Sequence, residues 1–160
     1  MPGFDDPIAL LLACHDKILA HCHLLEGLLD TPDKAVATQV HRYFNTSAPL
    51  HQQDEEEDLF PRINGQSLKI AELVHKLKKE HQAMDSLWGT LAAELKSPPE
   101  NGFSEVFVSA TREFCRLNRD HVALENRNLL PVAAGSLSQQ DLGALGETMA
   151  ARRGVRYSAL

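Results

Sequence analysis

Apolar residues recur at every third or fourth position along most of this chain, which is the spacing of one face of an α-helix. The pattern predicts four long helices, at about residues 7–29, 34–59, 67–96 and 104–130, and a shorter fifth helix at about 141–153. No segment shows the strict alternation of apolar and polar residues that marks a half-buried strand. The sequence therefore predicts an all-α protein.

Capping residues and prolines set the expected helix boundaries. Asp6 can cap the first helix, and Pro7 suits the first helical position because its missing N–H needs no partner there. Pro49 lies inside the second helix and is expected to kink it, since proline removes one backbone hydrogen bond. Pro61 and Pro131 are expected to end the second and fourth helices.

The loops between the long helices are short, which favours an up-down-up-down four-helix bundle. We expect the bundle to span about residues 7–131 and to be followed by a short helix and tail at about 138–160, within one domain of 160 residues. Gly143 and Gly146 lower the helix propensity of the fifth helix, so it is expected to be the least stable element.

One histidine replaces an apolar residue on the core-facing stripe of each long helix. Two of these histidines are followed four residues later by a glutamate, which places an imidazole and a carboxylate on one face. The residues concerned are His15, His51 with Glu55, His81, and His121 with Glu125. With a rise of about 1.5 Å per residue, all six fall in one layer of an antiparallel bundle, and His81 fits least well.

These six residues are the candidate metal ligands. A single core histidine is more often structural than a ligand, but four at one height beside two buried carboxylates need a compensating positive charge, which a metal supplies. Imidazole and carboxylate together suit iron, zinc or manganese better than calcium or magnesium. The alternative is a metal-free bundle with structural histidines. We find no set of catalytic residues and no phosphate-binding loop.

The arrangement resembles the hemerythrin-like family of HHE cation-binding domains over roughly residues 8–131. Ferritin-like bundles use Glu-x-x-His, so the order and spacing here argue against them. The resemblance lies in His15, in His51-x-x-x-Glu55 before Leu59-Phe60-Pro61, in Glu80-His81, and in His121-x-x-x-Glu125 before Leu129-Leu130-Pro131.

The resemblance implies a non-haem di-iron centre inside the bundle. The four histidines would be terminal ligands, and Glu55 and Glu125 would bridge the two irons together with an oxo or hydroxo group. O2 or a similar small diatomic molecule would bind at an open iron position. Zinc or manganese could occupy the same ligands.

The chain departs from the oxygen-carrying hemerythrins at Leu77, where those proteins have a further histidine. About one position stays open on each iron, and solvent, Asp85 or another carboxylate could fill it. This makes sensing or redox chemistry more plausible than simple oxygen carriage. We therefore expect binding of O2 or a related diatomic for sensing, storage or delivery. The alternatives are a di-iron peroxidase or oxidase, and iron storage or donation for the repair of damaged iron centres.

Acidic residues near the candidate ligands are expected to be solvated. Asp54, Asp58 and Glu80 could instead accept hydrogen bonds from the ligand imidazoles. Glu56 and Glu57 are assigned to a solvated acidic face.

The remaining assignments concern the core and the C-terminus. Aromatic and other apolar residues one or two turns from the ligands are core residues that could also line a dry pocket for a gas. A basic cluster near the C-terminus is interpreted as a solvated helix end. The first group is Met84, Trp88, Phe114 and Leu117; the second is Arg152, Arg153 and Arg156.

Composition narrows the class of partner. The net charge of -6 argues against nucleic-acid binding, which needs a basic face. No apolar run approaches the ~20 residues of a membrane span, and the acidic start does not resemble a signal peptide. Cys14, Cys22 and Cys115 have no C-x-x-C spacing, which indicates free thiols in a reducing cytoplasm. We expect a cytoplasmic protein, with no indication of its protein partners or oligomeric state.

Overall fold

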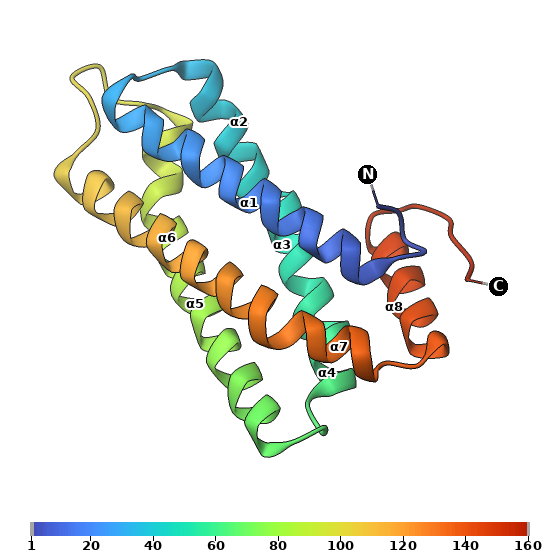
Figure 1. The fold of residues 1–160 in the computed structure, drawn as a ribbon. Coiled ribbons are helices and arrows are strands. Elements are labelled where there is room, and N and C mark those ends of the chain that lie inside the picture. The colour runs from blue at the N-terminus through green and yellow to red at the C-terminus, as the bar shows by residue number, and fades with distance from the viewer. Residues whose placement is uncertain (1, 160) are drawn as a thin grey trace.

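The computed structural model describes residues 2–159, and all regular secondary structure in that range is helical. The predicted all-α class is confirmed. Four columns of helix lie side by side, and a short helix lies across one end (Figure 1). The columns are α1 (Pro7–Asp30); α2 (Lys34–Asn45), α3 (Ser47–Gln53), η1 (Asp54–Leu59) and α4 (Phe60–Ile63); α5 (Leu68–Lys96); and α6 (Glu105–Leu124), η2 (Glu125–Leu129) and α7 (Leu130–Ser136). The short helix is α8 (Gln139–Arg152).

Contacts between the helices close a ring around one core. Helix α1 packs against α2 and α6, and α5 packs against the same two helices. This pattern favours the predicted four-helix bundle, while its up-down-up-down order stays a prediction. Side-chain caps begin the columns as expected from the sequence, since Asp6 accepts a hydrogen bond from the backbone N–H of Ala9 and Ser67 accepts one from Ile70.

The second column breaks earlier than predicted. Its first segment, α2, ends at Asn45, and α3 begins at Ser47, so the break falls at Thr46 and not at Pro49. A proline cannot donate to the carbonyl four residues before it, and its ring clashes with that carbonyl, which here belongs to Asn45. The chain therefore interrupts the helix one turn ahead of Pro49, which then sits in the first turn of α3.

The expectation that Pro61 and Pro131 end their helices is wrong. Each proline instead lies in the first turn of a continuing helix, so the columns run on to Ile63 and Ser136. Both prolines follow π-helical segments, η1 and η2, in which the backbone hydrogen bonds reach five residues back. The wider π turn changes the register of the helix just before the proline and lets the chain continue.

The apolar core is divided by a layer of buried polar side chains. One cluster contains Ile18 and Met84, and the other contains Leu11 and Leu77. His15 lies between the two clusters on α1, and His81 lies between them on α5. The interruptions in the hydrophobic pattern thus mark a real layer inside the bundle.

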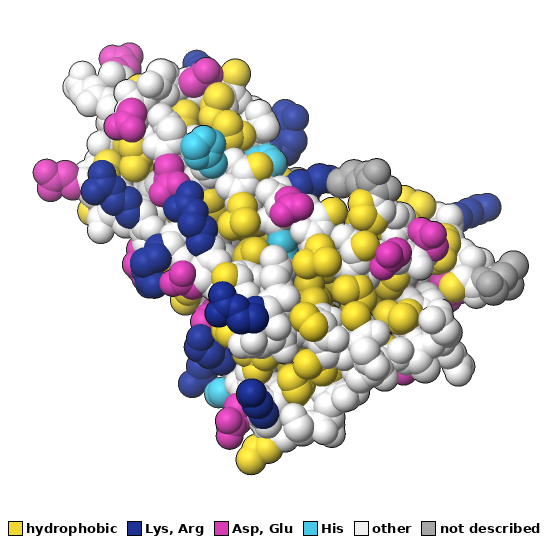
Figure 2. Space-filling model, viewed as in Figure 1, with side chains coloured by type: hydrophobic (Ala, Val, Ile, Leu, Met, Phe, Trp, Pro, Cys, Tyr) yellow, Lys and Arg dark blue, Asp and Glu magenta, His cyan; other side chains and the backbone are white. Residues whose placement is uncertain are grey.

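Helix α1 is unusually apolar. Among residues 2–159 it is the one helix whose length and composition would also suit a membrane span, which corrects the expectation that no such run exists. Hydrophobic side chains gather over the N-terminal half of α1 on the face shown in Figure 2. Within that half of the helix, the side chain of Leu12 is exposed. The inner face of α1 is buried along its full length against the core, but only 28% of its most apolar stretch is buried, so several of its apolar side chains lie near the surface.

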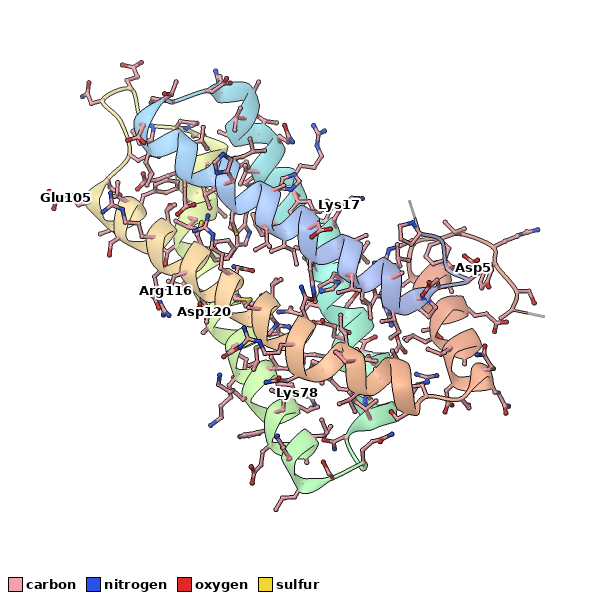
Figure 3. The ribbon with its side chains drawn as sticks, viewed as in Figure 1. Asp5, Lys17, Lys78, Glu105, Arg116 and Asp120 are labelled. Carbon is pink, nitrogen blue, oxygen red and sulfur yellow. The ribbon has the colours of Figure 1, made fainter. Side chains whose placement is uncertain are left out.

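Charged side chains are spread over the outside of the columns. Arg116 and Asp120 on α6 point away from the bundle in Figure 3 and form an exposed ion pair, with Nη1 and Oδ2 3.0 Å apart. Exposed pairs of this kind contribute about 0–1 kcal/mol, so they do not define the fold.

Helix α8 covers the end of the bundle where α1 begins. Ser138 caps it by accepting a hydrogen bond from the backbone N–H of Asp141. Leu145 and Met149 are fully buried and join the core cluster at that end. Gly146 is needed at its position, because a Cβ there would lie 2.1 Å from the carbonyl oxygen of Phe4.

Candidate metal centre

The six predicted ligands lie together in the polar layer. One or two come from each column of the bundle, and each of the six residues is at most 5% exposed. They are His15, His51, Glu55, His81, His121 and Glu125. The hydrophobic periodicity of four separate helices therefore located one buried cluster.

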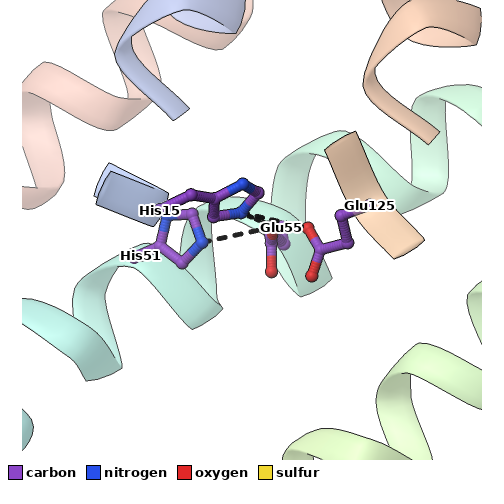
Figure 4. Close-up of side chains that lie close together, drawn as sticks. All are labelled: His15, His51, Glu55 and Glu125. Carbon is purple, nitrogen blue, oxygen red and sulfur yellow. Dashed lines mark ion pairs between the residues drawn. The ribbon is translucent and has the colours of Figure 1, made fainter. Parts of the chain in front are cut away.

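The cluster divides into two sets of four that share both glutamates. His15 and His51 join Glu55 and Glu125 in one set, and His81 joins the same glutamates with His121 in the other. In each set one nitrogen or oxygen atom from every residue lies within 4.8 Å of the others. Figure 4 shows the first set, with both imidazoles directed at the carboxylates. Each set has the residue types and the spacing to hold one metal ion.

Glu55 turns one oxygen toward each set. Its Oε2 lies 3.5 Å from Nε2 of His15 and 3.3 Å from Nε2 of His51. Its Oε1 lies 3.2 Å from Nε2 of His81. The carboxylate thus spans the two sets, as a carboxylate shared between two cations would.

Glu125 spans the sets in the same way. Its Oε2 lies 3.4 Å from Nε2 of His15, and its Oε1 contacts Nε2 of His121. The two glutamates come from η1 and η2, so both shared carboxylates sit on π-helical turns. Such turns are rare and are found disproportionately at functional sites.

The polar atoms at the centre lack ordinary hydrogen bonds. Within the described residues, all four carboxylate oxygens of Glu55 and Glu125, together with Nε2 of His15 and of His121, are buried without a hydrogen-bond partner. Buried polar atoms without partners are costly, and buried charges are normally paired or coordinate a metal. The donor set therefore fits a cation at its centre.

Three of the four imidazoles are held from behind by hydrogen bonds at Nδ1. His81 donates to Oε2 of Glu56 at 2.6 Å, and His121 donates to Oε1 of Glu80 at 2.8 Å. His15 pairs with Oδ1 of Asn126 at 2.5 Å. These bonds fix the ring orientation and direct each Nε2 inward, which is the usual support for a metal-binding histidine.

The assignment of Glu56 to the solvated face is wrong, because π-helical η1 turns it toward His81. Glu80 accepts a hydrogen bond from a ligand imidazole, that of His121, which confirms the alternative to a solvated position. Asn126 was missed in the sequence. All three partner residues are direct sequence neighbours of a candidate ligand: Glu56 and Asn126 each follow a glutamate of the cluster, and Glu80 precedes His81. None of them lies on an apolar stripe, so the hydrophobic pattern alone does not identify them.

His51 lacks such support. Its Nδ1 is buried and makes no hydrogen bond to the part of the chain that the structure describes, and the Cys14 thiol is the neighbouring polar group. The three cysteines are free, as predicted.

Asp54 and Asp58 do not bond to the imidazoles. Both are buried, and both pair with Arg152, while Asp54 also pairs with Arg153. The interpretation of the basic cluster as a solvated helix end is therefore wrong for Arg152 and Arg153. It holds for Arg156, which is exposed.

The neighbouring carboxylates raise the pKa of three of the four imidazoles, those of His15, His51 and His121. Burial lowers the pKa of His15, but contact with Glu125 and then Glu55 outweighs burial and raises the pKa to about 9. The pKa of His121 is likewise raised to about 9, against burial, by Glu125 and Glu80. Burial opposes ionisation of the Glu55–His51 pair, yet their mutual attraction holds the pKa of His51 well above, and that of Glu55 well below, its usual value. Protons thus supply the positive charge that a metal would replace.

A pocket of about 70 Å³ adjoins the polar layer on the side of the apolar cluster that contains Ile18 and Met84. One water needs roughly 10–15 Å³ by a comparable measure, so a diatomic molecule fits. Three of the predicted pocket residues line it, while Leu117 does not. Its lining includes His51, His81, His121, Met84, Trp88 and Phe114, with Asp85 also at the wall.

Comparison with known proteins points in the same direction. A family model described as the Hemerythrin HHE cation binding domain matches residues 6–133. An uncharacterized protein of Haemophilus influenzae is 30% identical over 161 residues, which cover 96% of this chain and 93% of the relative. The family match contains all six residues of the buried cluster and stops before α8.

Proposed function

Since this chain belongs to the hemerythrin HHE cation-binding domain family, we propose that its buried cluster holds two iron ions and that the adjoining pocket takes up O2 or a related diatomic molecule for sensing, storage or delivery. The proposal rests on one observation: Glu55 and Glu125 each direct one carboxylate oxygen toward one pair of histidines and the other oxygen toward the second pair. That arrangement suits two neighbouring cations, whereas a single ion would leave one set of nitrogens without a partner.

Each side chain has a distinct role in this proposal. His15 and His51 would hold one iron, His81 and His121 would hold the other, and Glu55 and Glu125 would be shared between the two. When bound, the irons supply redox-active cations with open positions for a small ligand. Zinc or manganese could occupy the same donors.

The pocket favours a small and weakly polar ligand. Met84, Trp88 and Phe114 provide apolar walls, and the imidazoles of His51, His81 and His121 form its inner end. Polar residues complete the lining at Gln52, Asp85 and Asn118, and the exposed Asp85 connects the pocket with the surface.

The position of Leu77 supports sensing or redox chemistry over simple carriage. Leu77 is fully buried in the apolar cluster that contains Leu11, so the turn before His81 offers no nitrogen. Asp85 lies one turn after His81 at the pocket wall, where a carboxylate or solvent could complete an open position.

A chain of aromatic rings favours the peroxidase or oxidase alternative as a second candidate. The ring centroids of Tyr43 and Phe44 lie 5.1 Å apart, and those of Phe44 and Trp88 also lie 5.1 Å apart. Phe44 and Trp88 both line the pocket, and Trp88 is half-buried, so these aromatic rings offer a route for electrons between the pocket and the surface at Trp88. Turnover with peroxide and a reductant would identify this activity.

The ligand assignment is tested by metal content in matched variants. His51→Ala should lower the iron content of the protein after anaerobic loading, because it removes a nitrogen that no described residue replaces. His75→Ala is the control, since His75 is exposed on α5 away from the cluster. Equal iron content in both variants and the wild type would contradict the assignment.

A further inference from the structure

Asp54 is a third buried carboxylate next to the proposed metal site. It directly precedes Glu55 and is 0% exposed, and both of its oxygens are bound by guanidinium groups, one from Arg152 at the end of α8 and one from Arg153 at its C-cap. Arg152 Nη1 lies 2.6 Å from Oδ1. Arg153 donates from Nη1 to Oδ1 at 3.0 Å and from Nη2 to Oδ2 at 2.6 Å. A buried carboxylate is thus fully paired with two cations from a distant part of the chain.

The same two arginines reach further along η1. Arg152 Nη2 lies 2.6 Å from Oδ2 of Asp58 and 3.1 Å from Oε2 of Glu57. Arg153 also donates from Nη1 to the carbonyl oxygen of Met149 at 2.9 Å, which ties its side chain to α8 itself. The two arginines at the C-terminal end of α8 therefore form ion pairs with three acidic side chains of η1.

The segment η1 presents successive side chains to three different surroundings. Asp54 faces α8, Glu55 faces the two histidine sets, and Glu56 faces Nδ1 of His81. A π-helical turn is less favourable than an α-helical one, so outside contacts are needed to keep it. The arginine contacts act on the residue directly before Glu55.

We propose that Arg152 and Arg153 are positioning residues for the metal site. By holding Asp54, they keep η1 in the conformation in which Glu55 turns one oxygen to each metal. They also neutralise a carboxylate that would otherwise stand buried and uncompensated beside the site. This inference rests on the proposed function, and it adds an element that the family match, ending at residue 133, does not include.

A purely structural role makes a different prediction. Buried ion pairs can stabilise α8 without affecting the site, and their loss would then lower only the stability of the fold. The test must therefore follow the metal as well as the fold. Cobalt(II) is a suitable probe, because its visible absorption reports the geometry of its ligands and its release to a chelator can be timed.

The variants are Arg152→Gln with Arg153→Gln, Asp54→Asn, and the triple combination. Arg156→Gln is the matched control, because it removes a charge from the same stretch at an exposed position. Asp54→Asn keeps the shape of the side chain and removes the buried carboxylate, while Arg152 keeps Asp58 and Glu57 as partners and the partly exposed Arg153 loses its carboxylate partner. It therefore reports on the site even where loss of both arginines prevents folding.

We expect the arginine pair variant and Asp54→Asn to release cobalt(II) about 10- to 100-fold faster than the wild type and to change its visible spectrum. The triple variant should release it no faster than the pair variant, because both changes remove one interaction. Arg156→Gln should match the wild type. A lower unfolding temperature with unchanged release and spectrum would overturn the inference, as would unchanged release in Asp54→Asn alone. A wild-type protein that takes up no cobalt(II) or iron would instead contradict the proposed function.

Discussion

Glu125 contacts two of the four buried histidines, His15 and His121, and it favours the protonated form of both more than any other residue does. It is the largest influence raising the pKa of His15 and of His121 to about 9. Both carboxylate oxygens of Glu125 are buried and have no hydrogen-bond partner of ordinary geometry within the described residues. Glu125 therefore influences the charge of the cluster, and in the proposed metal site it would be one of the two shared carboxylates.

Replacing Glu125 with glutamine should lower both histidine pKa values while keeping the shape of the side chain. An amide cannot stabilise the imidazolium as a carboxylate does, so burial then dominates and favours the neutral ring. Imidazole resonances followed by NMR during a pH titration of the metal-free protein measure the change. Glu113→Gln is the control, since Glu113 is exposed and pairs with Arg116. Unchanged His15 and His121 pKa values would contradict the assigned contacts.

The metal-free protein should lose stability as the pH rises. His15 and His121 have folded pKa values of about 9, above the ordinary value of 6.5. Their contribution is therefore complete below pH 6.5 and is lost as the pH rises through 9. Thermal unfolding in the presence of a chelator should show a lower midpoint at pH 9 than at pH 6.5. A midpoint that rises over this range would show that these imidazoles are neutral in the folded state.

Metal binding should show the opposite pH dependence. A metal needs neutral imidazoles, so it must displace the protons on these rings and bind more tightly as the pH rises toward 9. Titration calorimetry at pH 7 in two buffers with different ionisation enthalpies should detect the released protons. Identical heats in both buffers would contradict a protonated metal-free site.

The six candidate ligands could be predicted because each interrupts an apolar stripe, and that signal is local to one helix. The outer partners could not be predicted in the same way. Glu56, Glu80 and Asn126 lie beside the stripes, and their roles depend on which helix faces them. The pairing of Asp54 with Arg153 is harder still, since nothing in the local pattern of either residue indicates the other.

At the level of the helices, the π-helical turns are the main departure from the sequence prediction. The positions of Pro61 and Pro131 in the sequence predict helix ends, because proline cannot continue an α-helical ladder. In the structure, each follows a π-helical turn that changes the register and carries a shared glutamate. The periodicity of the side chains did not reveal the extra residue in each turn, because the apolar pattern resumes at Leu59 and Leu129.

Two glycines in helices should respond oppositely to alanine. Gly89 has open space around the position of a Cβ, so Gly89→Ala should stabilise the protein by about 0.5–1 kcal/mol through better helix propensity. Gly146→Ala would bring a Cβ to 2.1 Å from the Phe4 carbonyl oxygen and should destabilise it by about 1–3 kcal/mol. Urea unfolding measures both changes. Equal effects would show that the N-terminal segment does not pack closely on α8.

For the molecule as a whole, the polar layer lies between two apolar clusters. One contains Phe44 and Phe114, and the other contains Phe60 and Leu130. The sequence predicted this layer from helix lengths and short loops, because a common height follows from the helical rise. The sequence does not predict that α8 packs on the second cluster or that its C-terminal arginines pair with η1. Both depend on contacts between distant parts of the chain.

Removing the metal should lower the stability of the whole bundle. A ligand bound only by the folded state adds about 2.7 kcal/mol when its free concentration is roughly 100 times its dissociation constant. Thermal unfolding with added iron, compared with unfolding after treatment with a chelator, measures this difference under anaerobic conditions. The difference should vanish in Glu125→Ala and persist in His75→Ala.

The most direct test of the central claim is the iron content of the wild-type protein, loaded anaerobically, with absorption spectra recorded before and after admission of air. We expect about two irons per chain and new near-ultraviolet bands in air. Reversal of those bands when oxygen is removed would indicate a carrier, and persistence would indicate a sensor or an oxidase. A cooperatively folded helical protein that retains no iron would contradict the claim and would leave the four histidines a structural role.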